Sequence, residues 1–183
     1  MKRLLAYLFL VLGFGLVFNI SDSKGKGGGI FIVNSDPVLT NVEITDNYAG
    51  EYGGGVYLLY SSASFTNFTI SGNIGSGSLQ KGGGVSCEST PNATFTEGFI
   101  VDNVGPYLGG GIAVSPAMYD SSSFHVELTD VLIQNNTSRW VGGGIFGSNI
   151  SLSGCTIKEN AAQSHGGGIL SEGNIIFSST NRC

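Results

Sequence analysis

Basic residues, cysteine and proline are all scarce in this sequence. Eight Lys and Arg side chains stand against 13 Asp and Glu, giving a net charge of −5, and only 11% of the 183 residues are charged. Nucleic-acid binding requires a basic stripe, so the composition excludes that class of function. Three cysteines do not make a disulfide framework in a chain of this length.

Glycine, by contrast, is abundant, with 30 residues against 4 prolines. The glycines do not recur at every third position, so the chain is not collagen-like. The hydrophobic residues reach 41%, which favours a folded chain over a disordered one, and the length suits one domain.

The N-terminal segment has a different composition from the rest. Lys2 and Arg3 precede an apolar run from Leu4 to Val17. A basic start followed by ~14 apolar residues is typical of a secretory signal, and the run is shorter than the ~20 residues of a membrane-spanning helix. We therefore predict a signal helix over residues 1–23 and a mature domain over residues 24–183, exported to the periplasm, the cell surface or the medium. An uncleaved signal acting as an anchor is the alternative, and it is the only membrane contact that we expect.

Two motifs repeat along the mature chain. Three glycines followed by Ile or Val occur six times, at spacings of 24–33 residues, beginning at Gly27, Gly53, Gly82, Gly109, Gly142 and Gly166. A nine-residue motif lies between consecutive triplets, at 39–47, 65–73, 95–103, 128–136 and 152–160. Its sixth residue is always Ile (Ile44, Ile70, Ile100, Ile133, Ile157), and its last is always Asn (Asn47, Asn73, Asn103, Asn136, Asn160).

Each unit therefore contains two short strands with one apolar face, which a single unit cannot bury. Stacked units bury these faces in one continuous core, with neighbouring strands ~4.8 Å apart. Leucine-rich repeats need a Leu ladder, and propeller blades need four strands over 40 or more residues. The sequence thus predicts an all-β fold, a right-handed parallel β-helix (solenoid) of about six coils, with the last coil incomplete.

The glycine and asparagine columns have structural roles in this fold. Glycine adopts positive φ without a Cβ clash, so we expect each triplet to form a tight corner. Asn tolerates left-handed backbone, and its amide can bond to the Asn of the next coil, so the five Asn residues predict a ladder at another corner. Cys87 and Cys155 fall at inward positions in different coils, and we expect them to be buried thiols without a disulfide.

The Gly-Gly-Gly-Ile triplets and the motifs that end in Asn resemble the repeats of chlamydial polymorphic outer-membrane proteins, and of exported right-handed β-helix proteins in general. The resemblance extends from Gly27 to about Ile176. The chain departs from the family in having Ile where the family's tetrad usually begins with Phe. The resemblance implies an adhesin-like role at a cell surface.

Polysaccharide lyases and hydrolases also use this fold, so we considered carboxylate pairs. The residues just before the ladder Asn are Asp46, Gly72, Asp102, Asn135 and Glu159. Asp46 and Asp102 are two coils apart, roughly 9–10 Å, which is too wide for one calcium ion, and we interpret them as solvated corner acids. Neither His125 nor His165 has metal-ligand spacing to a Cys or Asp, and we expect no catalytic residue, metal or cofactor. A carbohydrate-active β-helix, or a truncated fragment of a longer repeat protein, remains the alternative.

One strand residue per coil points outward, in the column Phe31, Tyr57, Ser86, Ala113, Phe146 and Leu170. We predict that Phe31, Tyr57, Phe146 and Leu170 form a contact strip for a glycan or a cell-surface protein. The alternative is that other segments cover them. A hydroxyl column (Thr40, Thr66, Thr96, Thr129, Ser153) is not expected to bind ice, which requires two such columns. The incomplete last coil also predicts end-to-end self-association through an open sheet edge.

Overall fold

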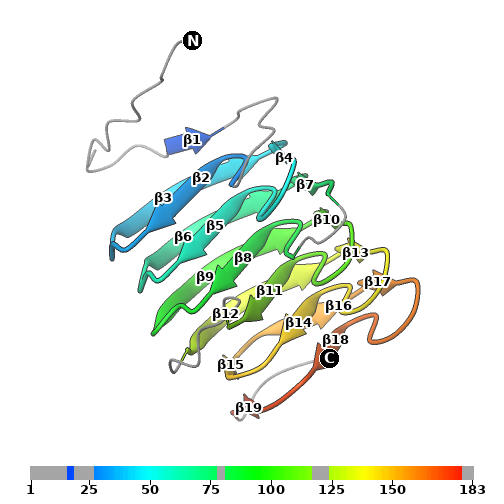
Figure 1. Cartoon of the computed structure of the whole chain (residues 1–183). Coiled ribbons are helices and arrows are strands. Elements are labelled where there is room, and N and C mark those ends of the chain that lie inside the picture. Colours follow the sequence, from blue (N-terminus) through cyan, green and yellow to red (C-terminus); the bar gives the residue numbers. More distant parts are fainter. Residues whose placement is uncertain (1–15, 19–26, 78–80, 117–123, 179–183) are drawn as a thin grey trace.

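The computed structural model describes residues 16–18, 27–77, 81–116 and 124–178. These residues form a parallel β-solenoid of about five turns, stacked in sequence order, as Figure 1 shows. The all-β parallel fold is thus confirmed. Six glycine triplets enclose only five intervals. The sheet that follows the triplets therefore has six strands, whereas the sheet of short strands between the triplets has five.

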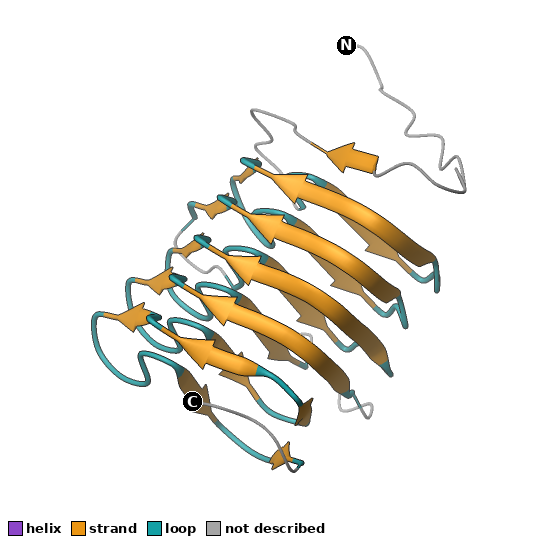
Figure 2. Cartoon of the chain, turned by 180° about the vertical axis from the view of Figure 1, so that it is seen from behind, coloured by secondary structure: helices purple, strands orange, loops and turns teal. Residues whose placement is uncertain are grey.

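Three parallel sheets run along the solenoid. Sheet 1 contains the longest strands, which Figure 2 shows side by side: β3 (Val38–Thr45), β6 (Ser64–Ser71), β9 (Ala93–Val101) and β12 (Val126–Gln134). Its shorter strands are β1 (Leu16–Phe18), β15 (Ile150–Ser153), β16 (Thr156–Lys158) and β19 (Ile175–Phe177), and β15 and β16 both pair with β12. Sheet 2 is made of two-residue strands: β4 (Tyr48–Ala49), β7 (Ile74–Gly75), β10 (Val104–Gly105), β13 (Thr137–Ser138) and β17 (Ala161–Ala162). Sheet 3 follows the glycine triplets: β2 (Ile30–Val33), β5 (Val56–Leu59), β8 (Val85–Glu88), β11 (Ile112–Ser115), β14 (Ile145–Gly147) and β18 (Ile169–Ser171).

The N-terminal prediction is only partly open to comparison with the structure. Most of the expected signal, residues 1–15 and 19–23, lies outside the described residues. Leu16–Phe18 is described, and it forms strand β1, paired with β3 from Leu16↔Val42 to Phe18↔Ile44, where we had predicted a helix. In the part of the chain that the structure describes, no helix is long and apolar enough to cross a membrane.

The core is built from aligned columns of apolar side chains. The motif Ile residues pair in register through sheet 1, for example Ile70↔Ile100 and Ile100↔Ile133, and each is at most 3% exposed. Stacked phenylalanines contribute a second column, in which the rings of Phe65 and Phe95 lie 4.9 Å apart with an interplanar angle of 7°. The apolar face expected for the strand that ends at the motif Ile is therefore the inward face. Phe65 and Phe95, five residues earlier, reach the same face because Asn67 and Glu97 have positive φ and break the alternation.

The Asn ladder is also confirmed. The Oδ1 of Asn103 accepts hydrogen bonds from the backbone N–H and the Nδ2 of Asn73, at 2.9 and 3.0 Å. Its own Nδ2 donates to Asn136 Oδ1 and to the carbonyl of Ile70, both at 3.0 Å. One detail differs from the prediction: the left-handed backbone belongs to the residue before each ladder Asn, as at Asp102 with φ 58°, and not to the Asn itself. The ladder Asn can therefore point inward, where its amide bonds are protected from water.

The glycine triplets combine a tight turn with close stacking. The first glycine has positive φ, as predicted, for example +70° at Gly82. The third is confined by the next turn, because a Cβ on Gly84 would lie 2.8 Å from the carbonyl oxygen of Gly111. Both conditions favour glycine, and together they explain why the triplet repeats.

The predictions for the cysteines hold where they are described. Cys87 and Cys155 are buried and form no disulfide. Burial raises the pKa of both thiols, so neither is activated as a nucleophile. Cys183 lies outside the described residues.

Candidate functional site

The predicted contact strip is a true column, but most of it is not open to solvent. Strand pairing aligns Phe31 with Tyr57 and Phe146 with Leu170 on the outer side of sheet 3. Phe31 is 47% exposed and Leu170 is half-buried, whereas Tyr57 and Phe146 are only 1% and 3% exposed. The prediction that these four residues present an open strip is therefore wrong for Tyr57 and Phe146.

The residues that precede the glycine triplets form an outer layer over this column. They are linked from turn to turn by parallel bridges, Lys81↔Leu108, Leu108↔Val141 and Val141↔His165. Val141 and Leu108 pack with Ala113, Phe146 and Leu170 in a small apolar cluster separate from the main core. The alternative of covered aromatics is thus the correct one for most of the strip.

A polar network lies on the same face of sheet 3. The ring of Tyr57 stacks on that of Tyr52, with the ring centroids 5.3 Å apart. Its hydroxyl donates a hydrogen bond to Glu88 Oε2 at 2.6 Å. Lys81 Nζ lies 3.0 Å from Glu88 Oε1 and donates to Ser115 Oγ at 2.8 Å. Burial and the bond to Glu88 raise the pKa of the Tyr57 phenol, so it remains a neutral donor. Because the partners come from three successive turns, the network stabilises the stack.

The acidic column has the geometry of a corner. Asp46 and Asp102 are exposed, have positive φ, and are separated in the stack by Gly72. His125 Nε2 lies 3.5 Å from Glu127 Oε1. Among the described residues, no three His, Cys, Asp or Glu side chains gather closely enough to hold a metal ion.

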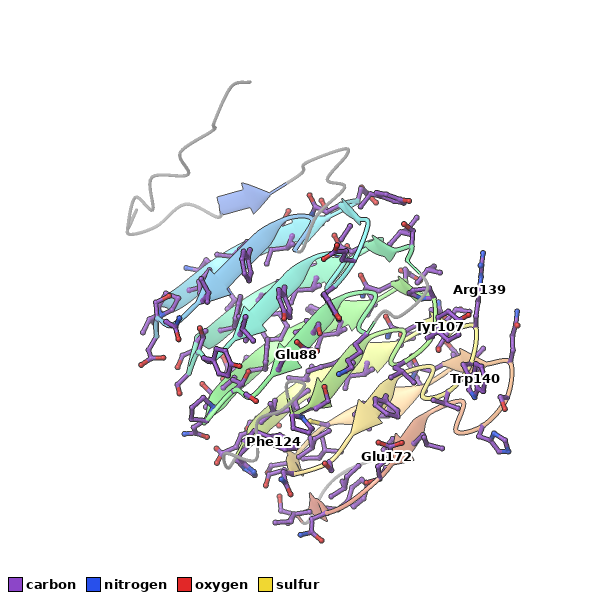
Figure 3. All side chains as sticks on the ribbon, viewed as in Figure 1. Glu88, Tyr107, Phe124, Arg139, Trp140 and Glu172 are labelled. Carbon is purple, nitrogen blue, oxygen red and sulfur yellow. The ribbon has the colours of Figure 1, made fainter. Side chains whose placement is uncertain are left out.

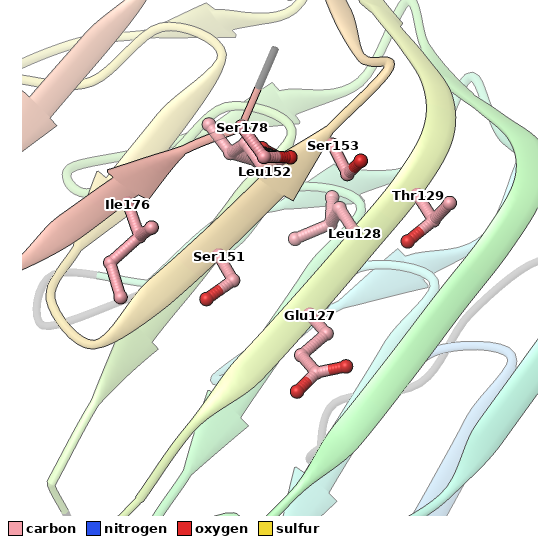
Figure 4. A pocket seen from close by; sticks show the side chains of 8 residues that line it. All are labelled: Glu127, Leu128, Thr129, Ser151, Leu152, Ser153, Ile176 and Ser178. Carbon is pink, nitrogen blue, oxygen red and sulfur yellow. Dashed lines mark hydrogen bonds between the residues drawn. The ribbon is translucent and has the colours of Figure 1, made fainter.

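The outer face of sheet 1 is rich in hydroxyl groups. Thr66, Thr96 and Thr129 stand in register, as expected, and a second column beside them contains Ser64 and Thr94. This second column is interrupted by Val38 and Glu127, so it is not a continuous match to the first. At the end of this face is a depression of about 250 Å³ (Figure 4), lined by Glu127, Leu128, Thr129, Ser151, Leu152, Ser153, Ile176 and Ser178.

Sequence reasoning missed a pair of exposed aromatic side chains, Tyr107 and Trp140, 36% and 53% exposed. Their ring centroids are 5.7 Å apart, and Figure 3 shows both at one edge of the solenoid, with Arg139 close by. A signal was present, because Trp140 is the only tryptophan of the chain and both residues stand two positions before a glycine triplet in consecutive turns. Phe99 on sheet 1 is also exposed, at 49%, and stacks with no other aromatic ring of the described residues.

Comparison of the chain with protein-family models, with curated proteins and with solved structures finds no match. The likeness to polymorphic outer-membrane proteins therefore depends on the repeat motifs alone.

Proposed function

We propose that this protein is an exported, non-catalytic β-solenoid that serves adhesion or surface interaction, with a glycan or a cell-surface protein as its partner. The observation that carries the proposal is the exposure of aromatic rings: Phe31, Tyr107 and Trp140 are each at least 36% exposed. Tyr107 and Trp140 also lie together, with ring centroids 5.7 Å apart, and exposed aromatic side chains on a polar surface mark interaction sites.

Two further features support the proposal. The basic and apolar N-terminal segment is typical of exported proteins. A stack of turns also presents the same backbone positions at regular intervals along one surface, which suits the binding of extended ligands.

A binding assay on the purified chain tests the proposal. We expect it to bind immobilised glycans or intact cells saturably, and the same protein unfolded in urea to lose that binding. We also expect no cleavage of neutral or acidic polysaccharides, with or without calcium. Absence of any saturable binding by the folded chain, or polysaccharide cleavage that disappears in Asp46→Asn or Asp102→Asn, would contradict the proposal.

A further inference from the structure

Tyr107 and Trp140 form a two-ring platform on consecutive turns. Tyr107 follows β10 and Trp140 follows β13, and these two strands pair in sheet 2 through Val104↔Thr137. The ring planes are tilted by 30° at a centroid separation of 5.7 Å. The repeat itself therefore places the two rings side by side, with a large part of each in contact with solvent.

Hydrogen bonds hold the backbone under both rings. The Tyr107 carbonyl accepts from the backbone N–H of Val141 at 3.0 Å and from the Ser138 hydroxyl at 2.5 Å. The backbone N–H of Trp140 donates to the same Ser138 hydroxyl at 3.3 Å. The backbone carbonyl of Trp140 accepts from the backbone N–H of Ser164 at 2.8 Å. A platform fixed in this way loses little conformational entropy when a ligand binds.

Polar side chains adjoin the platform in the sequence and in the next turn. Arg139 precedes Trp140, is exposed, and forms no ion pair with any described residue. Gln163, Ser164 and His165 are exposed in the following turn, and the backbone of Ser164 is bonded to Trp140. The rings are thus accompanied by several hydrogen-bond donors and acceptors that solvent already reaches.

We propose that Tyr107 and Trp140 form a carbohydrate-binding site, in which the apolar face of a pyranose ring stacks on the platform and the adjoining polar side chains bind its hydroxyls. This inference deepens the proposed adhesive function and rests on it. A sugar ring has one apolar face and a polar edge, which is the combination that this site offers.

The size of the platform favours a sugar over a protein partner. A stable protein interface buries about 800 Å² on each partner around a core from which charged residues are depleted. Here the exposed residues that flank Trp140 are Arg139 and the polar segment 163–165. Two rings surrounded in this way cover one or two sugar units but supply little of the apolar core of a protein interface.

The single tryptophan makes the site directly observable, because the intrinsic tryptophan fluorescence of the chain comes from Trp140 alone. The full chain is titrated with a panel of soluble neutral and uronic-acid oligosaccharides while this fluorescence is recorded. We expect at least one oligosaccharide to change it saturably. Tyr107→Ala, which keeps the reporter, should weaken that binding about tenfold, the effect of losing roughly one stacking contact. Trp140→Ala, measured on immobilised sugar, should weaken it at least as much.

Phe99→Ala is the matched control, since it removes an equally exposed aromatic ring from sheet 1, and its affinity should equal that of the parent. Unchanged affinity in Tyr107→Ala and Trp140→Ala, with circular dichroism like that of the parent, would overturn the inference. So would loss of binding in Phe31→Ser alone, which would place the contact on sheet 3. A parent that binds cells or proteins but no sugar of the panel would overturn the inference and leave the adhesive function standing, whereas a parent that binds nothing would remove both.

Discussion

The buried Asn ladder allows a quantitative test of what holds the turns together. In Asn103→Ala, the backbone N–H and the Nδ2 of Asn73 lose their common acceptor, and the carbonyl of Ile70 loses a donor. Asn103 and Asn73 are both fully buried, so water does not readily replace these bonds. Each unsatisfied buried donor costs about 1–3 kcal/mol, so the two donors of Asn73 should lower the free energy of unfolding by about 2–6 kcal/mol.

Asn160→Ala is the control at the end of the same ladder. Asn160 accepts from the backbone N–H and Nδ2 of Asn136 and donates to the carbonyl of Ile133, which matches three of the four side-chain bonds of Asn103, but it is half-buried. Water that replaces the lost amide recovers most of the energy, so we expect a cost of about 1 kcal/mol or less.

Urea unfolding, followed by far-ultraviolet circular dichroism and by the fluorescence of Trp140, measures both variants. With an m-value of about 2 kcal/mol/M, Asn103→Ala should lower the midpoint by about 1–3 M and Asn160→Ala by about 0.5 M or less. Coincidence of the two probes shows whether the stack unfolds as one unit, which a repeat protein need not do. Equal midpoints for the two variants would refute the argument that burial of the amide bonds makes the ladder stabilising.

Three other changes test the packing of the turns. In the same urea experiment, Ile133→Ala should lower the free energy of unfolding by about 2–5 kcal/mol and Leu132→Ala by far less, because Ile133 is fully buried and Leu132 only half-buried. Equal losses of stability in the two variants would contradict the inward register. Gly84→Ala should lower the melting temperature by several degrees, since the added Cβ would lie 2.8 Å from the carbonyl oxygen of Gly111 in the next turn. Gly168→Ala should melt like the parent, because the nearest atom to its added Cβ is a methyl carbon of Ile157 at 3.7 Å. In a chain carrying Cys183→Ser, a thiol reagent at pH 8 should label neither buried cysteine until urea is added, because burial raises the pKa of both thiols; rapid labelling of the folded chain would show that the core opens.

The core and the ladder could be predicted from the sequence because they belong to columns. Ile133 and Asn136 recur at the same motif positions in every turn, so five independent occurrences support each assignment. Strand alternation places Val131 and Ile133 on one face, and both are buried. Leu128 is also buried because Asp130, with φ 54°, breaks the alternation between them, which the pattern alone does not predict. The number of turns was overestimated because each triplet was counted as a coil, whereas a turn requires the segment between two triplets.

Alternation gives no information on whether an outward residue reaches water. Tyr57 and Phe31 occupy the same outward position in neighbouring strands, yet their exposures are 1% and 47%. Tyr57 is covered because Tyr52 stacks on its ring and Glu88 accepts a hydrogen bond from its hydroxyl, and both contacts come from outside its own strand. The glycine at positive φ after Tyr52 turns the chain so sharply that the residue before the triplet lies over the strand after it.

The same turn explains why the aromatic platform escaped a strand-based search. Tyr107 and Trp140 lie in the loop between sheets 2 and 3, where no alternation applies, so they belonged to none of the columns that we considered. Repetition nevertheless constrains loops as well as strands, since Val141 N–H bonds to the Tyr107 carbonyl and Ser164 N–H to that of Trp140, one turn further along. Equivalent loop positions therefore stack like strand positions, and two aromatic residues at one such position in consecutive turns must come to lie side by side. Beside sheet 3, whose outward strand residues are largely covered, these loop columns supply the accessible surface at which we expect recognition.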